Sequence, residues 1–550
     1  MFHRRRRGHG TDDRGGQREH PGWIGTAAIS VHAGGRSANC DNQPDLSVLY
    51  PLGSIRRRWA EASFCDVATY REMEMMARPN VLWICTDQQR FDTVGGLNNP
   101  HISTPNFDRL MDTGVAFSHA YSQSPVCTPS RYAFLTGRYP RTARGRQNGQ
   151  AVPIPDEPYI TKLLADDGWD CGLSGKLHLA VCQDTVEPRT DDGYSTFHWS
   201  HHPSPDWEEN EYSQWLKREG LQWEELHPFR PGVDGYYGEG CPAEYHQTKW
   251  CADRAIDHLK DSDGPWLVSV NVFDPHHAFD PPPEYLERWN IEEIPLPKYR
   301  PGELQDKPEF QRIDHQGGYG GRGLSAADAT DEDLRGVRAA YWAMIENIDH
   351  NLGRMLDALE ETGQRENTIV IFQSDHGEML GDHGILLKGP YFYEEAIRVP
   401  LIISWPGHFQ EGLVSDALVE LVDIAPTLVE ITGVKPNKGM QGRSLVPILQ
   451  GEADPHTHKD DIYCEYYNAM PFHDPPPYGT MYRDGRYKIC VFHGTHRGQG
   501  ELYDLQEDPD EFENLWDEPT CAGLKQDLIA RCFDRSVFTM DPWPERAGRY

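Results

Sequence analysis

Short apolar runs that end abruptly in polar side chains constrain the fold of this chain more than any other feature. They are residues 81–85 before Asp87, residues 266–273 before Asp274, and residues 368–372 before Gln373. A run that is apolar at nearly every position, without alternation, is typical of a strand buried on both faces, as in a parallel sheet. A fourth run, residues 400–405, has the same character.

Helices are predicted between these runs. Apolar residues recur at three- and four-residue steps from Leu334 to Leu359, and Thr330 offers a capping start for this long amphipathic helix. Thr104 and Pro105 predict another helix, with Thr104 as its cap. Strands alternating with helices indicate an α/β fold with a mostly parallel sheet flanked by helices. Ligands of such sheets bind beyond the carboxyl ends of the strands, so the polar clusters mark the candidate active site.

Three regions are predicted along the chain. Residues 1–75 are rich in Arg, Gly and His without periodicity, which indicates a disordered extension or an incorrectly assigned start before Met76. Residues 76–452 form the α/β domain, and residues 453–550 form a smaller α+β subdomain. Within these regions, long loops are expected at 185–250 and 280–325, and a helix near 519–535. Strands are expected at 461–467 and 481–492, the second divided by a hairpin turn at Asp484-Gly485.

Composition excludes several classes of protein. The formal net charge is −33, which argues against binding to nucleic acid or to an anionic membrane. No apolar segment follows the N-terminal arginines, so we expect no signal peptide, no transmembrane span and a cytoplasmic location. The 12 cysteines include no CxxC pair, which fits a reducing compartment better than a disulfide framework or a zinc ribbon.

The segment Cys127-Thr128-Pro129-Ser130-Arg131 carries the most specific chemical signal. Pro129 suits the first turn of a helix, which would place Cys127 at a helix N-terminus that favours anions. A lone cysteine is more often a small apolar residue in a loop. A plain thiolate nucleophile is a third interpretation, and the absence of a legible Cys-His-Asn arrangement speaks against it.

Asp87-Gln88 and Asp375-His376 are adjacent pairs of potential metal ligands after two separate strands. Alone, either pair would more often belong to a turn or a helix cap. Together, at equivalent strand ends, they predict a site for one hard or borderline divalent ion, because they combine oxygen ligands with one imidazole.

Three basic side chains follow predicted strands: Lys176, His178 and His276. A fourth, Lys388, lies twelve residues past His376. A lone Lys-x-His is usually only a surface turn, yet Lys176 follows a predicted strand at 169–173. The triplet that begins at Asp382 repeats the Asp-His-Gly sequence of Asp375, and we interpret this second copy as structural.

The order of these motifs resembles the sulfatase branch of the alkaline-phosphatase-like superfamily. The similarity runs from about Arg78 to Trp516, and the cysteine segment matches the C-x-P-S-R signature in which the cysteine is oxidised to formylglycine. The other matching segments are Asn80-Val81-Leu82, Thr104-Pro105-Asn106, Leu135-Thr136-Gly137-Arg138, Gly175-Lys176-Leu177-His178, Ser374-Asp375-His376-Gly377, residues 422–427 and residues 501–505.

The resemblance implies roles for the matching residues. The expected metal ligands are Asp87, Gln88, Asp375, His376 and modified Cys127. Arg131 would steady the formylglycine hydrate, and Asn148 would contact the substrate. The remaining basic residues would bind sulfate and move protons: Lys176, His178, His276 and Lys388. The implied reaction hydrolyses a sulfate ester of a small molecule or glycan, after maturation by a formylglycine-generating enzyme.

Two residues depart from the common sulfatase pattern and keep alternatives open. Many sulfatases carry Asp where Gln88 stands and Asn where His376 stands, and the pair found here is similar to that of phosphonate monoester hydrolases. The resemblance implies Ca²⁺, whereas the imidazole ligand suits Mn²⁺ or another transition metal. The alternatives are therefore a phosphonate monoester or phosphodiester hydrolase, and a non-catalytic binder of sulfated glycans with unmodified Cys127.

Overall fold

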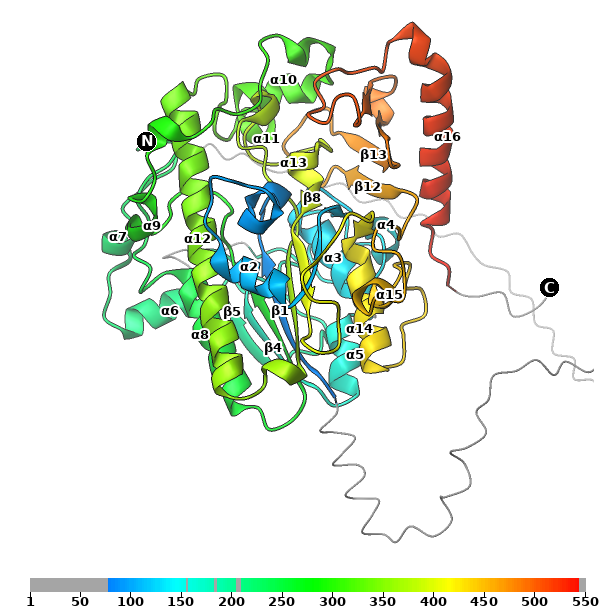
Figure 1. The fold of residues 1–550 in the computed structure, drawn as a ribbon. Helices are drawn as coiled ribbons and strands as arrows, with labels where there is room; N and C mark the ends of the chain where they lie inside the picture. Colours follow the sequence, from blue (N-terminus) through cyan, green and yellow to red (C-terminus); the bar gives the residue numbers. More distant parts are fainter. Residues whose placement is uncertain (1–77, 155–156, 183–184, 204–208, 544–550) are drawn as a thin grey trace, which may run out of the picture. The chain divides into compact units, whose positions relative to one another are not determined.

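The computed structural model describes residues 78–154, 157–182, 185–203 and 209–543. The predicted extension, residues 1–75, lies outside the described residues. A central sheet is covered by helices on both faces, and a second sheet follows near the C-terminus (Figure 1). The mixed α/β class with a mostly parallel sheet, predicted from the apolar runs, is confirmed.

The central sheet has eight strands in the order β10-β2-β9-β7-β1-β6-β4-β5. Five of its seven pairings are parallel, and only β9 runs against its two neighbours. The four apolar runs became its central strands: β1 (Asn80–Thr86), β6 (Trp266–Asn271), β7 (Thr368–Ser374) and β9 (Leu401–Ser404). The other strands are β2 (Gly114–Phe117), β4 (Asp170–Gly175), β5 (Thr196–Trp199) and β10 (Leu413–Ser415).

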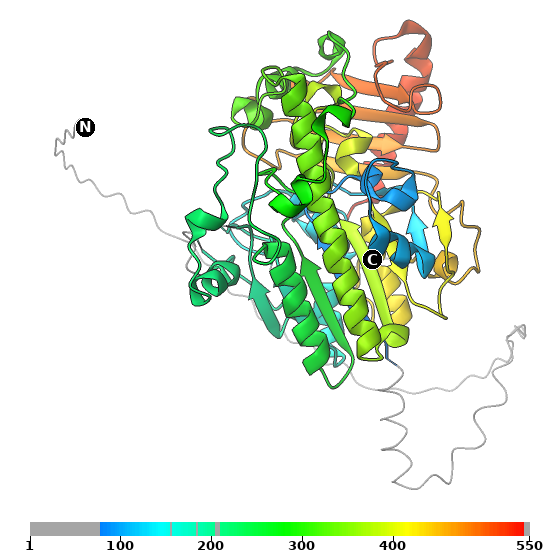
Figure 2. The same cartoon turned by 60° about the vertical axis from the view of Figure 1, so that its left-hand side comes forward.

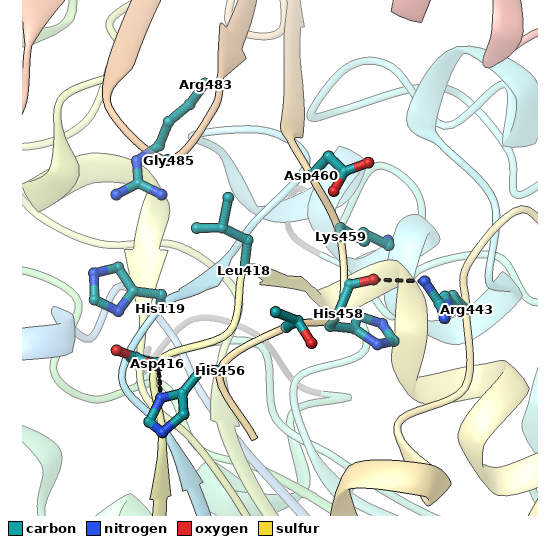
Figure 3. A pocket seen from close by; sticks show the side chains of 11 residues that line it. His119, Asp416, Leu418, Arg443, His456, His458, Lys459, Asp460, Arg483 and Gly485 are labelled. Carbon is teal, nitrogen blue, oxygen red and sulfur yellow. Dashed lines mark hydrogen bonds and ion pairs between the residues drawn. The ribbon is translucent and has the colours of Figure 1, made fainter. Parts of the chain in front are cut away.

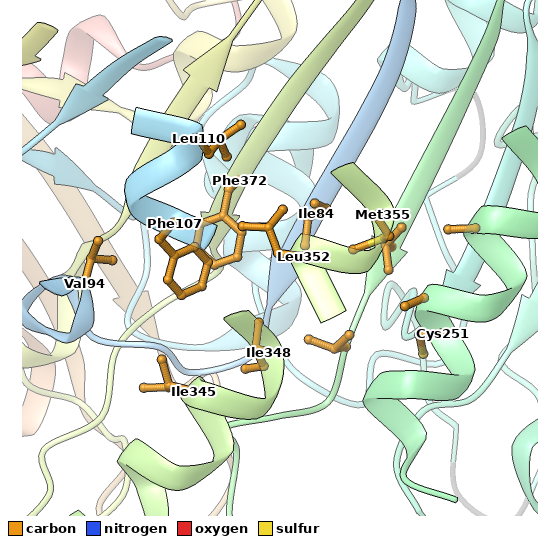
Figure 4. Packing of buried hydrophobic residues seen from close by; sticks show 14 of the residues in the cluster. Ile84, Val94, Phe107, Leu110, Cys251, Ile345, Ile348, Leu352, Met355 and Phe372 are labelled. Atoms are coloured by element: carbon orange, nitrogen blue, oxygen red, sulfur yellow. The ribbon is translucent and has the colours of Figure 1, made fainter. Parts of the chain in front are cut away.

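Alternation along β1 divides the core into two layers. Leu82 and Ile84 pack into one buried cluster with α2 (Pro105–Asp112), α8 (Gln247–Asp261) and α12 (Asp331–Glu361). Figure 4 shows Ile84 in this layer beside Leu352 and Met355 of α12. Val81 and Trp83 face the opposite layer, which contains α3 (Cys127–Thr136), α5 (Ile160–Asp166) and α14 (Ile424–Thr432). Successive side chains of a strand point to opposite faces, so an all-apolar strand serves both layers.

Two predicted helix starts had different outcomes. Thr330 caps α12 as expected, and its side chain and that of Asp333 form a reciprocal capping box. The prediction that Thr104 caps α2 was wrong in its chemistry, because the Thr104 hydroxyl accepts a hydrogen bond from Gly95 instead. Asp349 of α12 takes over the cap and accepts from the backbone N–H groups of Asn106 and Phe107.

The chain beyond the α/β layers forms a four-stranded antiparallel sheet with α16 (Ala522–Phe538) packed on it. Figure 2 shows this sheet and helix in orange and red above the central sheet. Its strands are β12 (Ile462–Tyr467), β13 (Tyr478–Arg483), β14 (Tyr487–Phe492) and β15 (Gly500–Asp504). The sequence predicted the first three strands and the helix, whereas β15 was not assigned as a strand.

The two segments expected to be long loops contain several short helices. Within 185–250 and 280–325 these are α6 (Glu211–Arg218), α7 (Trp223–Leu226), α9 (Pro283–Leu286), α10 (Glu309–Gln316) and α11 (Gly318–Gly321). The remaining short elements are α4 (Pro140–Ala143), α13 (Glu394–Ile397), α15 (Val446–Leu449), and the small sheet of β3 (Ala120–Tyr121), β8 (Arg398–Val399) and β11 (Val419–Glu420). Among the described residues, no helix is both long and apolar enough to span a membrane.

Candidate active site

The carboxyl ends of four parallel strands bring the predicted site residues to one edge of the sheet. In the register of β1 with β7, Thr86 pairs with Ser374, so Asp87 and Asp375 follow at the same level. The turns after β4 and β6 add the basic residues Lys176, His178 and His276. Residues far apart in the sequence are thereby placed side by side by the sheet alone.

Cys127 is the first residue of α3 and is fully enclosed by charged groups. Its Sγ lies 3.2 Å from His376 Nε2, 3.3 Å from Lys388 Nζ and 3.6 Å from Asp87 Oδ1. Lys176 Nζ is 3.9 Å away. Burial and Asp87 raise the pKa of the thiol, but the two lysines and His376 outweigh them and the pKa is lowered. The position therefore stabilises negative charge on the atom attached to the Cys127 Cβ.

Four potential metal ligands meet at this point. The donor atoms of Asp87, Cys127, Asp375 and His376 all lie within 4.8 Å of one another. His376 is fixed as a ligand because its Nδ1 lies 2.9 Å from the carbonyl of Gly377, which leaves Nε2 to face the cluster. Two carboxylates with one oriented imidazole suit one divalent ion, so the residues present fit the metal that the family implies.

Gln88, the other predicted ligand, lies beside this cluster with both ends of its amide engaged. Its Oε1 accepts a hydrogen bond from Lys388 Nζ at 2.7 Å, and its Nε2 donates to Glu378. Its backbone has a positive φ of 72°, a conformation that directs the chain sharply away from β1. The structure thus ties Gln88 to Lys388 as well as to the edge of the metal cluster.

The guanidinium of Arg131 bridges the carboxylates of Asp87 and Asp375. Its Nε donates to Asp375 Oδ2 at 2.9 Å, and an Nη lies 3.3 Å from Asp87 Oδ2. The other Nη donates to the carbonyl of Lys176 at 3.0 Å. All three side chains are buried, so the guanidinium compensates charges that would otherwise be costly to bury.

His178 and His276 border the same space and are neutral in this arrangement. Burial and Lys176 hold the pKa of His178 well below its usual value. Burial and Lys388 do the same for His276. Lys388 remains the protonated neighbour, because Cys127 and Asp87 outweigh its burial and raise its pKa.

Asn148, predicted to contact the substrate, also has a role in the helix that carries Cys127. Its Oδ1 accepts a hydrogen bond at 2.9 Å from the backbone N–H of Thr128, in the first turn of α3. The side-chain amide therefore caps the helix that follows the nucleophile position, and its Nδ2 is the end that remains for a ligand.

The second Asp-His-Gly triplet lies away from the metal cluster, as predicted. Asp382 pairs with Arg90 at 2.7 Å and with Arg338 at 3.0 Å, and His383 pairs with Glu303 at 2.8 Å. These are contacts that hold loops together and involve no predicted site residue.

Sequence reasoning missed two residues that support the site. Glu378 holds the Gln88 amide and accepts from the backbone N–H of Leu380 at 3.0 Å, and burial raises its pKa. The hydroxyl of Ser130 donates to the carbonyl of Asp375 at 2.5 Å. Ser130 lies inside a recognised segment, one residue before Arg131, and Glu378 directly follows another, two residues after His376, so their position was the only available signal.

A separate pocket of about 540 Å³ lies between the small sheet and the C-terminal residues (Figure 3). Two interactions join its lining residues: Asp416 pairs with His456 at 2.5 Å, and Arg443 donates to the carbonyl of His458 at 2.6 Å. It contains none of the residues predicted for catalysis. This pocket is therefore separate from the predicted site residues at the strand ends.

The fold and the cluster together define a hydrolase of the alkaline-phosphatase-like superfamily. A family model described as sulfatase matches residues 79–434, so the chain belongs to the sulfatase family, whose members are sulfuric ester hydrolases. A second model, described as the C-terminal part of N-sulphoglucosamine sulphohydrolase, matches residues 381–536.

The similar proteins include both a sulfatase and a phosphonate monoester hydrolase. A multifunctional alkaline phosphatase superfamily protein, PehA of Trinickia caryophylli, is 30% identical over 83% of this chain and 95% of its own length. An arylsulfatase of Clostridium perfringens is 29% identical over 80% of this chain and 90% of its own. The structure of the phosphonate monoester hydrolase of Agrobacterium radiobacter superposes with a TM-score of 0.73 at 27% identity, over 84% of this chain and 97% of that one.

The two Asp-His-Gly triplets provide a matched test of the metal cluster. We expect His376→Ala to weaken binding of the divalent ion at least about tenfold, because it removes an oriented ligand. His383→Ala should keep the full metal equivalent, although it also removes a buried imidazole. Metal content after chelation and reloading measures both. A His376→Ala protein with unchanged metal affinity would show that this imidazole is not a ligand.

Proposed function

We propose that this enzyme hydrolyses sulfate esters with a formylglycine nucleophile derived from Cys127. The observation that supports the proposal is the environment of Cys127, which opens a helix and faces two lysines, a histidine and a carboxylate within 3.9 Å. The sulfur seen here stands where the hydrated aldehyde would place its oxygens. A formylglycine-generating enzyme would oxidise Cys127 before the first turnover.

The hydrate explains why the position needs more than an ordinary hydroxyl or thiol. One of its two hydroxyls displaces the alcohol from sulfur and becomes a sulfate ester of the enzyme. Loss of the proton from the second hydroxyl then expels sulfate and restores the aldehyde, which water hydrates again. An ester formed on a serine would have no such exit.

Basic side chains would hold the sulfate group during both steps. Lys176, Lys388 and Arg131 surround Cys127 and offset charge on the equatorial oxygens of sulfur. A divalent ion bound by Asp87, Asp375 and His376, with Gln88 at its edge, would lower the pKa of the attacking hydroxyl and polarise the ester. Ca²⁺ is the ion that the sulfatase resemblance implies, and His376 makes Mn²⁺ or another transition metal the alternative.

The histidines would carry the protons. His178 is neutral, as a general base must be, and it would accept the proton of the second hydroxyl. His276 would donate to the leaving alcohol with help from Lys388. It is neutral in the free site, and the negative charge of a bound ester raises its pKa toward the protonated form that this role requires.

The names of the relatives suggest only the broad class of substrate. Relatives include an N-acetylglucosamine-6-O-sulfatase, an ulvan-active sulfatase and a choline-sulfatase, so both sulfated glycans and sulfated small molecules are represented. We propose a sulfated small molecule or glycan as the substrate of this chain. A second candidate is hydrolysis of phosphonate monoesters or phosphodiesters. It is favoured by the residue types at two positions, Gln88 and His376, which are similar to those of phosphonate monoester hydrolases.

Matched esters separate the two candidates. With mature, metal-defined enzyme and one nitrophenol as the common leaving group, we expect kcat/KM for the sulfate to exceed that for the phosphonate at least about tenfold, or about 1.4 kcal/mol in transition-state stabilisation. Cys127→Ala should abolish both activities. The reverse preference would assign the chain to phosphonate chemistry on the same scaffold.

His276→Ala tests the proton donor. General acid help is worth about a hundred- to ten-thousand-fold, and a sugar alkoxide needs it whereas a nitrophenolate does not. We therefore expect His276→Ala to reduce kcat/KM on an alkyl or sugar sulfate far more than on nitrophenyl sulfate. The control is His277→Ala, whose ring stacks on His276 at 4.1 Å and should affect both esters alike. Equal losses in the His276 variant would transfer the acid role to Lys388.

A further inference from the structure

A second group of metal-binding side chains lies next to the proposed catalytic base. One donor atom from each of His178, Cys182 and His201 lies within 4.8 Å of the other two. The rings of His178 and His201 meet edge to face, with their centroids 4.5 Å apart. Imidazole and thiolate are the ligands of zinc sites, and none of these three residues belongs to the cluster around Asp375.

Two observations support a binding role for this group: a buried ring nitrogen without a partner, and the burial of Cys182. His178 is only 7% exposed, and its Nδ1 is buried without a hydrogen-bond partner among the residues that the structure describes. A buried ring nitrogen without a partner is costly unless something binds it. Cys182, also 7% exposed, packs against Trp199 on the opposite side of the group.

A buried carboxylate fixes the turn that carries His178 and Cys182. Glu187 accepts backbone hydrogen bonds from His178 at 2.7 Å, Leu179 at 2.6 Å and Ala180 at 3.2 Å. It also accepts from the indole of Trp199 at 3.1 Å. These hydrogen bonds hold the backbone from His178 to Ala180, just before Cys182. Supporting hydrogen bonds of this kind typically preorganise a metal site.

We propose that His178, Cys182 and His201 bind a soft or borderline divalent cation such as Zn²⁺. The site has three protein ligands and would complete its tetrahedron with water or another exogenous ligand. Binding converts the Cys182 thiol into a thiolate with release of its proton to solvent, and no electrons are transferred. The hard ligands Asp87 and Asp375 keep the catalytic ion, so the two sites differ in the metal that they prefer.

Occupation of this site removes His178 from catalysis, because a neutral imidazole has one nitrogen lone pair to offer: once the cation takes it, the other ring nitrogen carries a hydrogen and cannot accept a proton. Zn²⁺ is thus an inhibitor that acts without displacing the catalytic ion. This consequence rests on the proposed role of His178 as base, whereas the binding itself does not.

Binding is tested by absorption of bound Co²⁺, in which a thiolate ligand gives a charge-transfer band in the near ultraviolet. The protein used is Cys127→Ala, which leaves no thiol at the catalytic position. We expect a band that Cys182→Ser abolishes and Cys171→Ser preserves, since Cys171 is equally buried but has no part in the group. Absence of the band, or its survival in Cys182→Ser, would overturn the site whatever the enzyme hydrolyses.

Inhibition is tested separately in mature enzyme with excess catalytic metal. We expect Cys182→Ser to keep its activity without Zn²⁺ and to require at least about tenfold more Zn²⁺ for half inhibition, because a ligand is lost. Cys171→Ser should respond as the unaltered enzyme does. Cobalt binding through Cys182 without any difference in Zn²⁺ sensitivity would keep the metal site and refute its effect on His178.

Discussion

The buried pairing of Arg131 with Asp87 and Asp375 is the interaction on which the rest of the site depends. Two carboxylates at 0% exposure lie at adjacent strand ends, and each would repel the other without a cation between them. Burial raises the pKa of Asp87, yet Lys176, Lys388 and Arg131 together bring it well below its usual value. The Asp87 carboxylate is thereby kept ionised, which is the form that a metal ligand requires.

The parallel sheet supplies the geometry that this charge cluster needs. β1 and β7 are paired along their whole length, so two residues 288 positions apart in the sequence, Asp87 and Asp375, reach the edge together. α3 carries Cys127 to this edge from the layer that Val81 and Trp83 face, and the adjacent residues Ser130 and Arg131 contact Asp375. A helix that carries both the nucleophile position and the guanidinium cannot shift without disturbing the metal ligands as well.

The sequence was sufficient where local pattern and tertiary structure agree. The all-apolar runs at 81–85 and 368–372 predicted buried strands, because only a parallel sheet with helices on both faces buries such runs completely. β2 and β10 were not predicted, since they have only four and three residues and are too short for a periodic signal. The cap of α2 could not be foreseen either, because Asp349 reaches it from a helix more than 240 residues away.

The site residues were named from motifs, and their contacts come from the fold. The strand-end positions of Asp87 and Asp375 follow from the sequence, but the link from Gln88 to Glu378 and the cap that Asn148 gives to α3 arise from turns with no periodic signal. The group of His178, Cys182 and His201 was equally invisible, because it joins the turns after two different strands.

The central claim is that Cys127 works as formylglycine, and mass spectrometry of its peptide from active enzyme tests it most directly. We expect the aldehyde at position 127. Across preparations with different extents of modification, the fraction of protein that carries it should rise in proportion to specific activity. Fully active protein that carries only the free thiol at Cys127 would contradict it.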